Sequence, residues 1–178
     1  MRQRRREAGT AAQEAVGGAP RALGPAPGDF DTWVAAWGDR LTQFAYTYTA
    51  NWASAQDVAQ ETFLRLYRQE QAGRPVHPGW LFAVARHLCI DAKRRAEPEP
   101  LSGGEADAGE EPALRRLLVR DLLDRLPPRD REVLWLFYYG GLSMAEVAGV
   151  VGIPARQVKT RLYRARQRFR ALWEGDDE

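Results

Sequence analysis

The chain has 178 residues, with 26 Lys and Arg against 24 Asp and Glu, and only one cysteine. That single residue, Cys89, excludes an internal disulfide, and neither a CxxC motif nor a Cys/His cluster indicates a metal site. No stretch approaches the ~18 apolar residues of a transmembrane helix. We therefore expect a cytoplasmic protein without membrane insertion, metal or cofactor.

Charge is segregated along the chain, although the formal net charge is only +2. Residues 97–112 carry six acids and no base, whereas residues 154–173 carry seven bases and no acid. The field of a local patch matters more than the total charge. The segregation therefore indicates a polyanion-binding surface near the C-terminus.

The first half of the chain predicts a disordered tail followed by three helices. Residues 1–28 are rich in Ala, Gly, Pro and Arg and bury too little surface to become ordered. From Asp29, apolar residues at spacings of three and four predict a helix of about five turns. Ser54 is the expected N-cap of a second helix that ends near Gln69, and a third runs from Trp80 to about Arg95. The predicted inward stripes are Phe30, Trp33, Val34, Trp37, Leu41, Phe44, Ala45 and Tyr48, then Val58, Thr62, Phe63, Leu66 and Tyr67, then Leu81, Val84, Ala85, Leu88 and Cys89.

Residues 97–112 have the Pro, Gly, Ser and acid content of a flexible linker. They divide the chain into an expected first domain, 29–96, and a second, 113–174. Leucines mark a helix before Pro127, and a further helix ends at Gly140. No period-two alternation predicts a strand. The expected fold is all-α, with two small helical domains that share no hydrophobic interior.

A helix-turn-helix is predicted from the spacing of small and apolar residues near the C-terminus. Ser143 and Glu146 form a capping box, S-x-x-E, which marks a helix start. Ala148 precedes Gly152 by four residues, and Val158 follows it by six. A small residue at the first position lets two helices cross closely, glycine takes the turn, and the aliphatic residue fixes the second helix.

The second helix of this motif separates an apolar stripe from a cationic face. At about 100° per residue, Val158, Leu162 and Ala165 share the side that packs on the domain. The opposite side has residue types that contact base edges in the major groove, and Arg166, Arg168 and Arg170 are placed for phosphates. A basic helix face is often only solvated surface, and a helix-turn-helix can also be a scaffold for protein contact. The helix-turn-helix spacing next to the cationic face favours DNA binding over both alternatives. The outward set is Arg156, Lys159, Thr160, Tyr163, Arg164 and Gln167.

Three stretches of the chain resemble one protein family. They are DVAQETFLRLYR from Asp57, WLFAVARHLCIDAKRR from Trp80, and LPPRDREVLWLFYYGGLSMAEVAGVVGIPARQVKTRLYRAR from Leu126. They are similar to the extracytoplasmic-function (ECF, group 4) sigma factors of bacterial RNA polymerase, in the sigma-70 family. The resemblance covers about residues 30–173 in the family's order and spacing.

The resemblance implies that the two domains are sigma domains 2 and 4, which together recognise promoters and melt the minus-10 element. It places minus-35 recognition on Arg156, Gln157, Lys159, Thr160, Arg161, Tyr163 and Arg164. It places minus-10 binding on Arg74, Pro75, Val76, His77, Trp80, His87, Asp91, Lys93, Arg94 and Arg95. It places the contact with core polymerase on Asp57, Gln60, Glu61, Leu64 and Arg65.

The chain departs from the family pattern at three positions. His87 stands where members most often have Asn, which leaves the preferred minus-10 base open. Phe137 stands where members often have a DNA-contacting Arg, and Arg156 stands where many have a small residue. The resemblance also implies that the acidic linker threads through polymerase; a mere solubilising tether is the alternative.

The implied partners are core RNA polymerase, promoter DNA and an anti-sigma factor. On core RNA polymerase, the implied contact surfaces are the clamp helices of the largest subunit and the flap of the second largest. A helix-turn-helix transcriptional regulator with an N-terminal helical interaction domain is the alternative function. An enzyme is not supported, because the sequence has no Ser/His/Asp arrangement and no Gly-rich phosphate loop.

Overall fold

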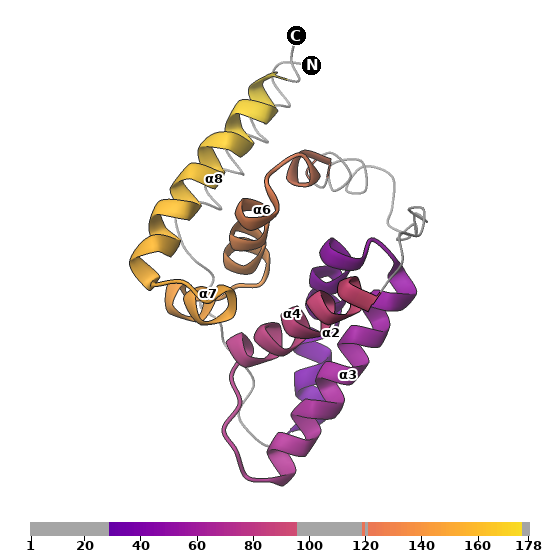
Figure 1. The fold of residues 1–178 in the computed structure, drawn as a ribbon. Helices are drawn as coiled ribbons and strands as arrows, with labels where there is room; N and C mark the ends of the chain where they lie inside the picture. Colours follow the sequence, from indigo (N-terminus) through magenta and orange to yellow (C-terminus); the bar gives the residue numbers. More distant parts are fainter. Residues whose placement is uncertain (1–28, 96–118, 120, 176–178) are drawn as a thin grey trace.

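The computed structural model describes residues 29–95, 119 and 121–175, and its helices fall into two groups (Figure 1). The predictions for residues 1–28, for the linker 97–112 and for residues 113–118 lie outside these ranges. Within them no strand is present, which confirms the all-α prediction. The first module, residues 29–95, contains α2 (Phe30–Thr49), α3 (Trp52–Gln71) and α4 (Pro78–Arg95). The second module, residues 119 and 121–175, contains α6 (Pro128–Leu134), the π-helix η1 (Trp135–Tyr139), α7 (Met144–Val151) and α8 (Ala155–Gly175).

Short polar side chains set where the first two helices begin. Asp29 caps α2 by accepting a hydrogen bond from the Thr32 amide at 3.4 Å, and its bonds with Thr32 lower the pKa of the Asp29 carboxyl. Asn51, not Ser54, caps α3, because Asn51 Oδ1 accepts from the Ser54 amide at 2.9 Å. The predicted cap at Ser54 is therefore wrong by one turn. Asn caps at least as well as Ser, and starting at Asn51 adds three residues to the helix.

Aromatic side chains of α2 and α4 fill the core of the first module. Trp33, Trp37 and Phe44 are fully buried, as predicted. Phe82 is also fully buried, although its position lies beside the predicted stripe of α4; Val84 and Leu88 are only half-buried. Tyr67 and Val34 fall on the predicted inward stripes but are 49% and 38% exposed. Tyr67 lies on the rim of the core, where its ring meets Phe30 edge-on at 5.8 Å.

In the second module, α6 and η1 form one continuous rod. Pro128 occupies the first turn of α6, where its missing N–H costs no hydrogen bond. The rod ends where the Gly140 amide donates to the Trp135 carbonyl at 2.8 Å. A Cβ at position 140 would lie 2.6 Å from the Leu136 carbonyl oxygen, so only glycine fits this close approach.

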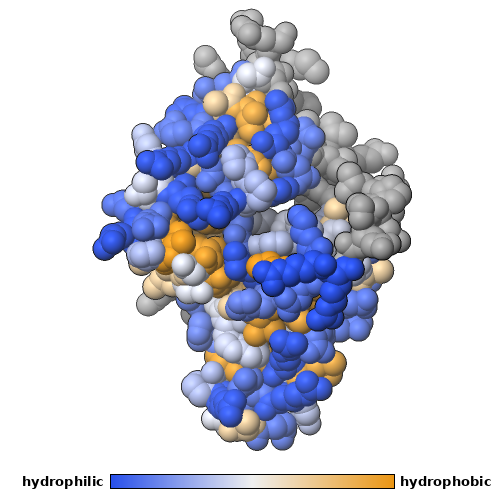
Figure 2. Space-filling model, in the orientation of Figure 1, coloured by the Kyte–Doolittle hydropathy of each residue, from blue (hydrophilic) through white to orange (hydrophobic). Residues whose placement is uncertain are grey.

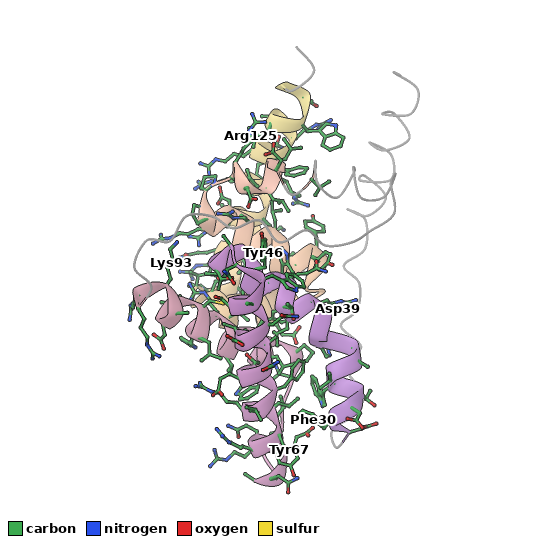
Figure 3. All side chains as sticks on the ribbon, turned by 90° about the vertical axis from the view of Figure 1, so that its right-hand side faces the viewer. Phe30, Asp39, Tyr46, Tyr67, Lys93 and Arg125 are labelled. Atoms are coloured by element: carbon green, nitrogen blue, oxygen red, sulfur yellow. The ribbon has the colours of Figure 1, made fainter. Side chains whose placement is uncertain are left out.

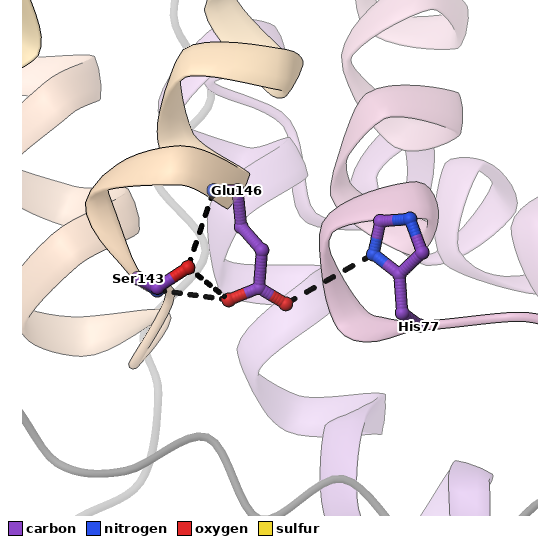
Figure 4. Close-up of polar contacts among 3 residues, drawn as sticks. All are labelled: His77, Ser143 and Glu146. Atoms are coloured by element: carbon purple, nitrogen blue, oxygen red, sulfur yellow. Dashed lines mark hydrogen bonds and ion pairs between the residues drawn. The ribbon is translucent and has the colours of Figure 1, made fainter. Parts of the chain in front are cut away.

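The helix-turn-helix forms as the spacing predicts. The Ser143 hydroxyl accepts from the Glu146 amide at 3.2 Å, and Glu146 Oε2 accepts from the Ser143 amide at 2.9 Å (Figure 4). Gly152 ends α7 with φ +71°, a left-handed conformation that glycine adopts without steric cost. Val147 and Val150 are the buried residues of α7, whereas Ala148 and Val151 are half-buried.

The turn glycine gives a stability prediction with a control on the neighbouring helix. Gly152→Ala should destabilise the second module by about 1 kcal/mol, because a Cβ in the left-handed region clashes with the backbone. Gly149 lies inside α7, and a Cβ added there would have nothing within 4 Å. Gly149→Ala should therefore stabilise the second module by about 0.5–1 kcal/mol, because alanine has the higher helix propensity. Urea unfolding followed by circular dichroism measures both, and equal shifts of the two midpoints would contradict the assigned turn.

The two modules are in contact, contrary to the expectation that they share no hydrophobic interior. Trp135 of η1 lies against Phe44 and Phe82 of the first module, and α4 packs on α7. One hydrophobic cluster therefore continues across the boundary. The spacing within each helix predicts which side is apolar, but not which other helix will cover that side. Each module still has its own set of buried residues, from α2, α3 and α4 or from α6, α7 and α8.

Candidate nucleic-acid interface

The cationic face of α8 points outward while its apolar stripe is buried. Val158, Leu162 and Ala165 are at most 2% exposed. On the other side Tyr163 is 58% exposed, and Lys159 and Arg164 are exposed beside it. Figure 2 shows a mostly hydrophilic surface over this helix. The sequence-based separation of the two faces of α8 is thus confirmed.

Other residues in the predicted minus-35 set differ in exposure. Arg156, Gln157 and Thr160 are exposed. Arg161 is half-buried at the edge of the apolar stripe, so only part of its side chain is accessible. The Thr160 hydroxyl donates a hydrogen bond to the Arg156 carbonyl at 3.5 Å. This bond uses the hydroxyl hydrogen of Thr160 and leaves its methyl group exposed.

The cations of α8 divide into two groups by their partners. In the part of the chain that the structure describes, Lys159 and Arg164 have no hydrogen-bond or ion-pair partner. Further along, each guanidinium binds within the chain: Arg166 donates to the Tyr138 hydroxyl at 3.2 Å, Arg168 pairs with buried Asp130, and Arg170 pairs with Glu174 at 2.9 Å. The sequence predicts phosphate contacts for these three residues. Their intramolecular bonds show that Arg166 and Arg168 also hold α8 onto the α6–η1 rod, and the phosphate contacts stay a prediction.

The predicted minus-10 residues occupy the loop before α4 and one face of that helix. Arg74, Pro75 and His77 are exposed, whereas Val76 is half-buried against the core. At 3.6 residues per turn, Trp80, His87, Asp91 and Arg94 fall on one side of α4. Trp80 is half-buried at the base of this side, and the other three are exposed.

The basic end of α4 extends away from the packed core. Lys93, Arg94 and Arg95 form its last turn and are all exposed. Figure 3 shows Lys93 at the end of the helix, directed away from the other labelled residues. Cations at a helix C-terminus also interact favourably with the helix dipole. The cluster is therefore accessible to a phosphate backbone and stabilises its own helix.

The predicted polymerase-binding residues form a polar ridge on α3 with one apolar side chain in it. Asp57, Gln60 and Arg65 are exposed, and Glu61 is half-buried. Arg65 Nε donates to Glu61 Oε1 at 2.8 Å. Leu64 is 52% exposed between them. This exposure leaves the Leu64 side chain accessible to a partner protein, and the contact with polymerase stays a prediction.

One residue near this ridge is absent from the predicted set. Tyr67 follows Leu64 by three residues on α3 and extends the apolar surface toward Phe30 (Figure 3). Its spacing places it on the inward stripe, which hides its exposure from an interpretation based on periodicity. Tyr67 lies at the edge of that stripe, because the neighbouring Leu66 is fully buried while Tyr67 is 49% exposed.

Within residues 29–95, 119 and 121–175, the remaining titratable groups give no sign of a reactive centre. Among the described residues, no three His, Cys, Asp or Glu side chains gather as a metal site. Burial raises the pKa of the Cys89 thiol to about 12, which keeps it protonated and unreactive. None of the helices described is both long and apolar enough to cross a membrane.

A helix-turn-helix whose second helix exposes unpaired cations and a tyrosine defines a DNA-binding protein of the helix-turn-helix class. Comparison with known proteins shows to which family within this class the chain is similar. The chain matches the family model Sigma-70 region 2 over residues 33–99 and the model Sigma-70, region 4 over residues 116–169.

Curated relatives match most of the chain. The ECF RNA polymerase sigma factor SigL of Mycobacterium tuberculosis is 37% identical over 141 residues, which cover 70% of this chain and 77% of SigL. SigW of Bacillus subtilis is 28% identical over 153 residues, covering 74% of this chain and 82% of SigW. The chain therefore belongs to the ECF RNA polymerase sigma factors.

Solved structures agree with this fold. CnrH, determined in complex with the cytosolic domain of CnrY, is 28% identical, with a TM-score of 0.62 over 93% of this chain and 96% of CnrH. The sigma factor RpoE of Bartonella quintana, determined in complex with the anti-sigma factor NepR, has a TM-score of 0.66 over 82% of this chain and 97% of RpoE. At 22% identity, the RpoE match supports the fold alone.

Proposed function

We propose that the chain directs core RNA polymerase to its promoters by dividing recognition between its two modules. The second domain, 113–174, reads the minus-35 element as duplex DNA. The first domain, 29–96, binds polymerase and opens the minus-10 element. The observation that carries this proposal is the outward face of α8, where Lys159, Tyr163 and Arg164 are exposed on a helix-turn-helix.

The chemistry of that face suits direct reading of base edges. Lys159 and Arg164 can each donate to guanine O6 and N7 in the major groove. Tyr163 and the Thr160 methyl can contact a thymine methyl group. Because neither cation has an intramolecular partner among the described residues, binding DNA breaks no existing ion pair.

The first module supplies the parts that promoter melting needs. An unstacked base requires a pocket, and the displaced strand requires cations along its backbone. The loop at Arg74–His77 and the Trp80–His87 side of α4 are the proposed pocket. Lys93, Arg94 and Arg95 are the proposed backbone contacts just upstream.

Polymerase would be contacted by both modules. The α3 ridge around Leu64 is the proposed surface for the clamp helices of the largest subunit, and the second module is the proposed partner of the flap. An anti-sigma factor is the proposed inhibitor; CnrH, a structural relative at 28% identity, is bound to a second protein. The protein would act in the cytoplasm, as a specificity subunit without catalytic activity.

Run-off transcription with core polymerase and a promoter library tests this function. Core enzyme plus the chain should yield transcripts from a subset of promoters sharing one minus-35 and one minus-10 sequence. Core enzyme alone should yield none of them. A chain that does not associate with core enzyme would contradict the proposal.

His87 gives a specificity prediction within the minus-10 pocket. Imidazole presents one donor and can stack, but it lacks the paired donor and acceptor of an amide. His87→Asn should therefore change the preferred base at one minus-10 position by roughly fivefold or more, since a base contact contributes about 1–3 kcal/mol. Sequencing of transcripts from the library reads this preference. An unchanged profile would mean that His87 is only an exposed helix residue.

A further inference from the structure

Two arginines of α8 bind the rod that α6 and η1 form. Arg168 pairs with Asp130 of α6, a carboxylate that is buried. Arg166, two residues earlier, donates to the Tyr138 hydroxyl of η1 at 3.2 Å. Tyr138 is half-buried, so this bond too lies partly out of water. The rod is therefore bonded to α8 at two points, one from each of its two segments.

The two points lie on opposite flanks of α8. At about 100° per residue, Arg166 falls roughly 70° to one side of the buried stripe of α8, and Arg168 roughly 90° to the other side. A bond on one flank alone would resist rotation of the helix about its axis in one direction only. Two bonds on opposite flanks resist it in both directions. The face opposite the stripe, which carries Tyr163 and Arg164, is thereby held in one orientation.

The π-helix η1 brings Tyr138 into line with Asp130. In a regular α-helix, two residues eight positions apart would lie about 80° apart around the axis. In η1 the Gly140 amide donates to the Trp135 carbonyl five residues earlier. A turn closed in this way takes about 4.4 residues, or roughly 80° per residue, so that four residues remove about 70° of the difference. Both side chains therefore face α8 from the same side of the rod.

A contact with a base edge tolerates little rotation of the helix that carries it. An α-helix with its side chains has a radius of about 5–6 Å, so a rotation of about 30° moves a side-chain tip by roughly 3 Å. That movement is as long as a hydrogen bond. It would withdraw one side chain from its base and bring another toward the groove. Rotation would thus change which base is preferred, whereas the general attraction to phosphates would persist.

We propose that Asp130 and Tyr138 are positioning residues that fix the rotation of α8 through Arg168 and Arg166, and so determine the base preference at the minus-35 element. We call these four residues the brace. Asp130 is buried and acts through its arginine. The effect on base preference rests on the proposed minus-35 function, so one measurement below uses no DNA.

Variants on the rod side of the brace test the proposal with a promoter library randomised at the minus-35 element. Asp130→Asn removes the charge at constant size, and Tyr138→Phe removes only the hydroxyl. In run-off transcription, each should lower the ratio of transcripts from preferred over non-preferred minus-35 sequences by about threefold or more. A role in stability alone would lower all transcripts in proportion. Unchanged ratios in both variants would therefore overturn the proposal.

Asp124 provides the matched control. Its carboxylate pairs with Arg131 of the rod at 2.5 Å rather than with α8. Asp124→Asn makes the same chemical change as Asp130→Asn and removes the charge of an ion pair on the same rod. It should leave the minus-35 ratios within about twofold. An equal change in both variants would show that the loss of any ion pair on the rod has this effect, and the brace would be refuted.

A double variant tests whether Asp130 acts through Arg168. Residues that act as one unit give effects that do not add. Arg168→Gln alone should change the minus-35 ratios about as much as Asp130→Asn does. Adding Asp130→Asn to the Arg168→Gln variant should change them no further. Full additivity of the two changes would mean that Asp130 does not act through this arginine, and would contradict the proposal.

Distances between spin labels test the rotation itself on the full chain without DNA. Gln167→Cys on α8 and Arg129→Cys on α6 place the labels at exposed positions, whereas Cys89 is buried and stays unlabelled. Combining Asp130→Asn with Tyr138→Phe should shift or broaden the distance distribution by at least about 2 Å. An unchanged distribution would overturn the brace. If the unmodified chain gives no promoter-selective transcription, the proposed function is wrong, and the label distances still decide whether the brace fixes α8.

Discussion

Arg164→Ala and Lys159→Ala should each reduce transcription from minus-35-dependent promoters by roughly 5- to 150-fold. Each side chain is exposed on α8 without an intramolecular partner in the described chain, and a good contact with a base edge contributes about 1–3 kcal/mol. Run-off transcription at a fixed salt concentration measures the loss, since phosphate contacts make binding strongly dependent on salt. Binding to core polymerase, measured in parallel, should not change.

A cation on the same helix provides the matched control. Arg170 is exposed and carries the same charge, but it pairs with Glu174 about two turns beyond the reading face. Arg170→Ala should lower transcription less than about threefold, because it removes a general attraction without a base contact. If Arg170→Ala and Arg164→Ala gave equal losses of transcription, α8 would contribute only a general electrostatic attraction to DNA and no base contact. If Arg164→Ala also weakened binding to core polymerase, the division of labour between the modules would be contradicted.

Leu64→Ala should weaken binding to core polymerase by about tenfold while leaving the fold unchanged. The side chain is 52% exposed in the free protein, so truncation leaves no cavity in the core. Burying a leucine at an interface contributes about 1.5–3 kcal/mol. Titration of labelled core enzyme with the protein measures the dissociation constant.

Val34 supplies the control for this truncation. It is also a partly exposed aliphatic residue of the first module, but it lies on α2 rather than on the α3 ridge. Val34→Ala should leave core binding within about twofold. A similar loss for both variants would show that the α3 ridge is not the docking surface. If neither variant weakened binding, the contact with core polymerase would lie elsewhere on the chain.

Local features of the fold can be predicted from the sequence because they depend on neighbouring residues. The capping box at Ser143 and Glu146, the glycine turn at Gly152 and the buried stripe from Val158 to Ala165 all follow from spacing within one or two helices. The outward face of α8 follows from the same spacing. Helix periodicity determines which residues share a side.

Predictions from the sequence are wrong where two local signals compete or where the core ends. Asn51 and Ser54 are both good N-caps, and the sequence does not show that the helix gains a turn by starting at the first. Tyr67 has the right spacing for the core but lies at its edge, 49% exposed beside the fully buried Leu66. Phe82 is buried although it lies off the predicted stripe, because α4 packs on both α2 and the second module.

The contact between the modules does not follow from periodicity at all. In the sequence, Trp135 is one more apolar residue of its helix, and Glu132 is an ordinary acid on a helix surface. Their partners all lie much earlier in the chain: Phe44 and Phe82 for Trp135, and Tyr48 and Arg86 for Glu132. The two polar pairs are separated by 84 and 46 residues. Such pairing depends on how whole helices pack against one another, which the spacing of residues within one helix does not determine.

The most direct test of the proposed function is whether tight promoter binding requires polymerase. Binding of a labelled promoter duplex should be measured with the protein alone, with core polymerase alone and with both together. We expect weak, unselective binding by either component and tight, sequence-selective binding by the pair. Tight and selective binding by the protein alone would contradict the proposal, and would indicate a conventional helix-turn-helix regulator instead.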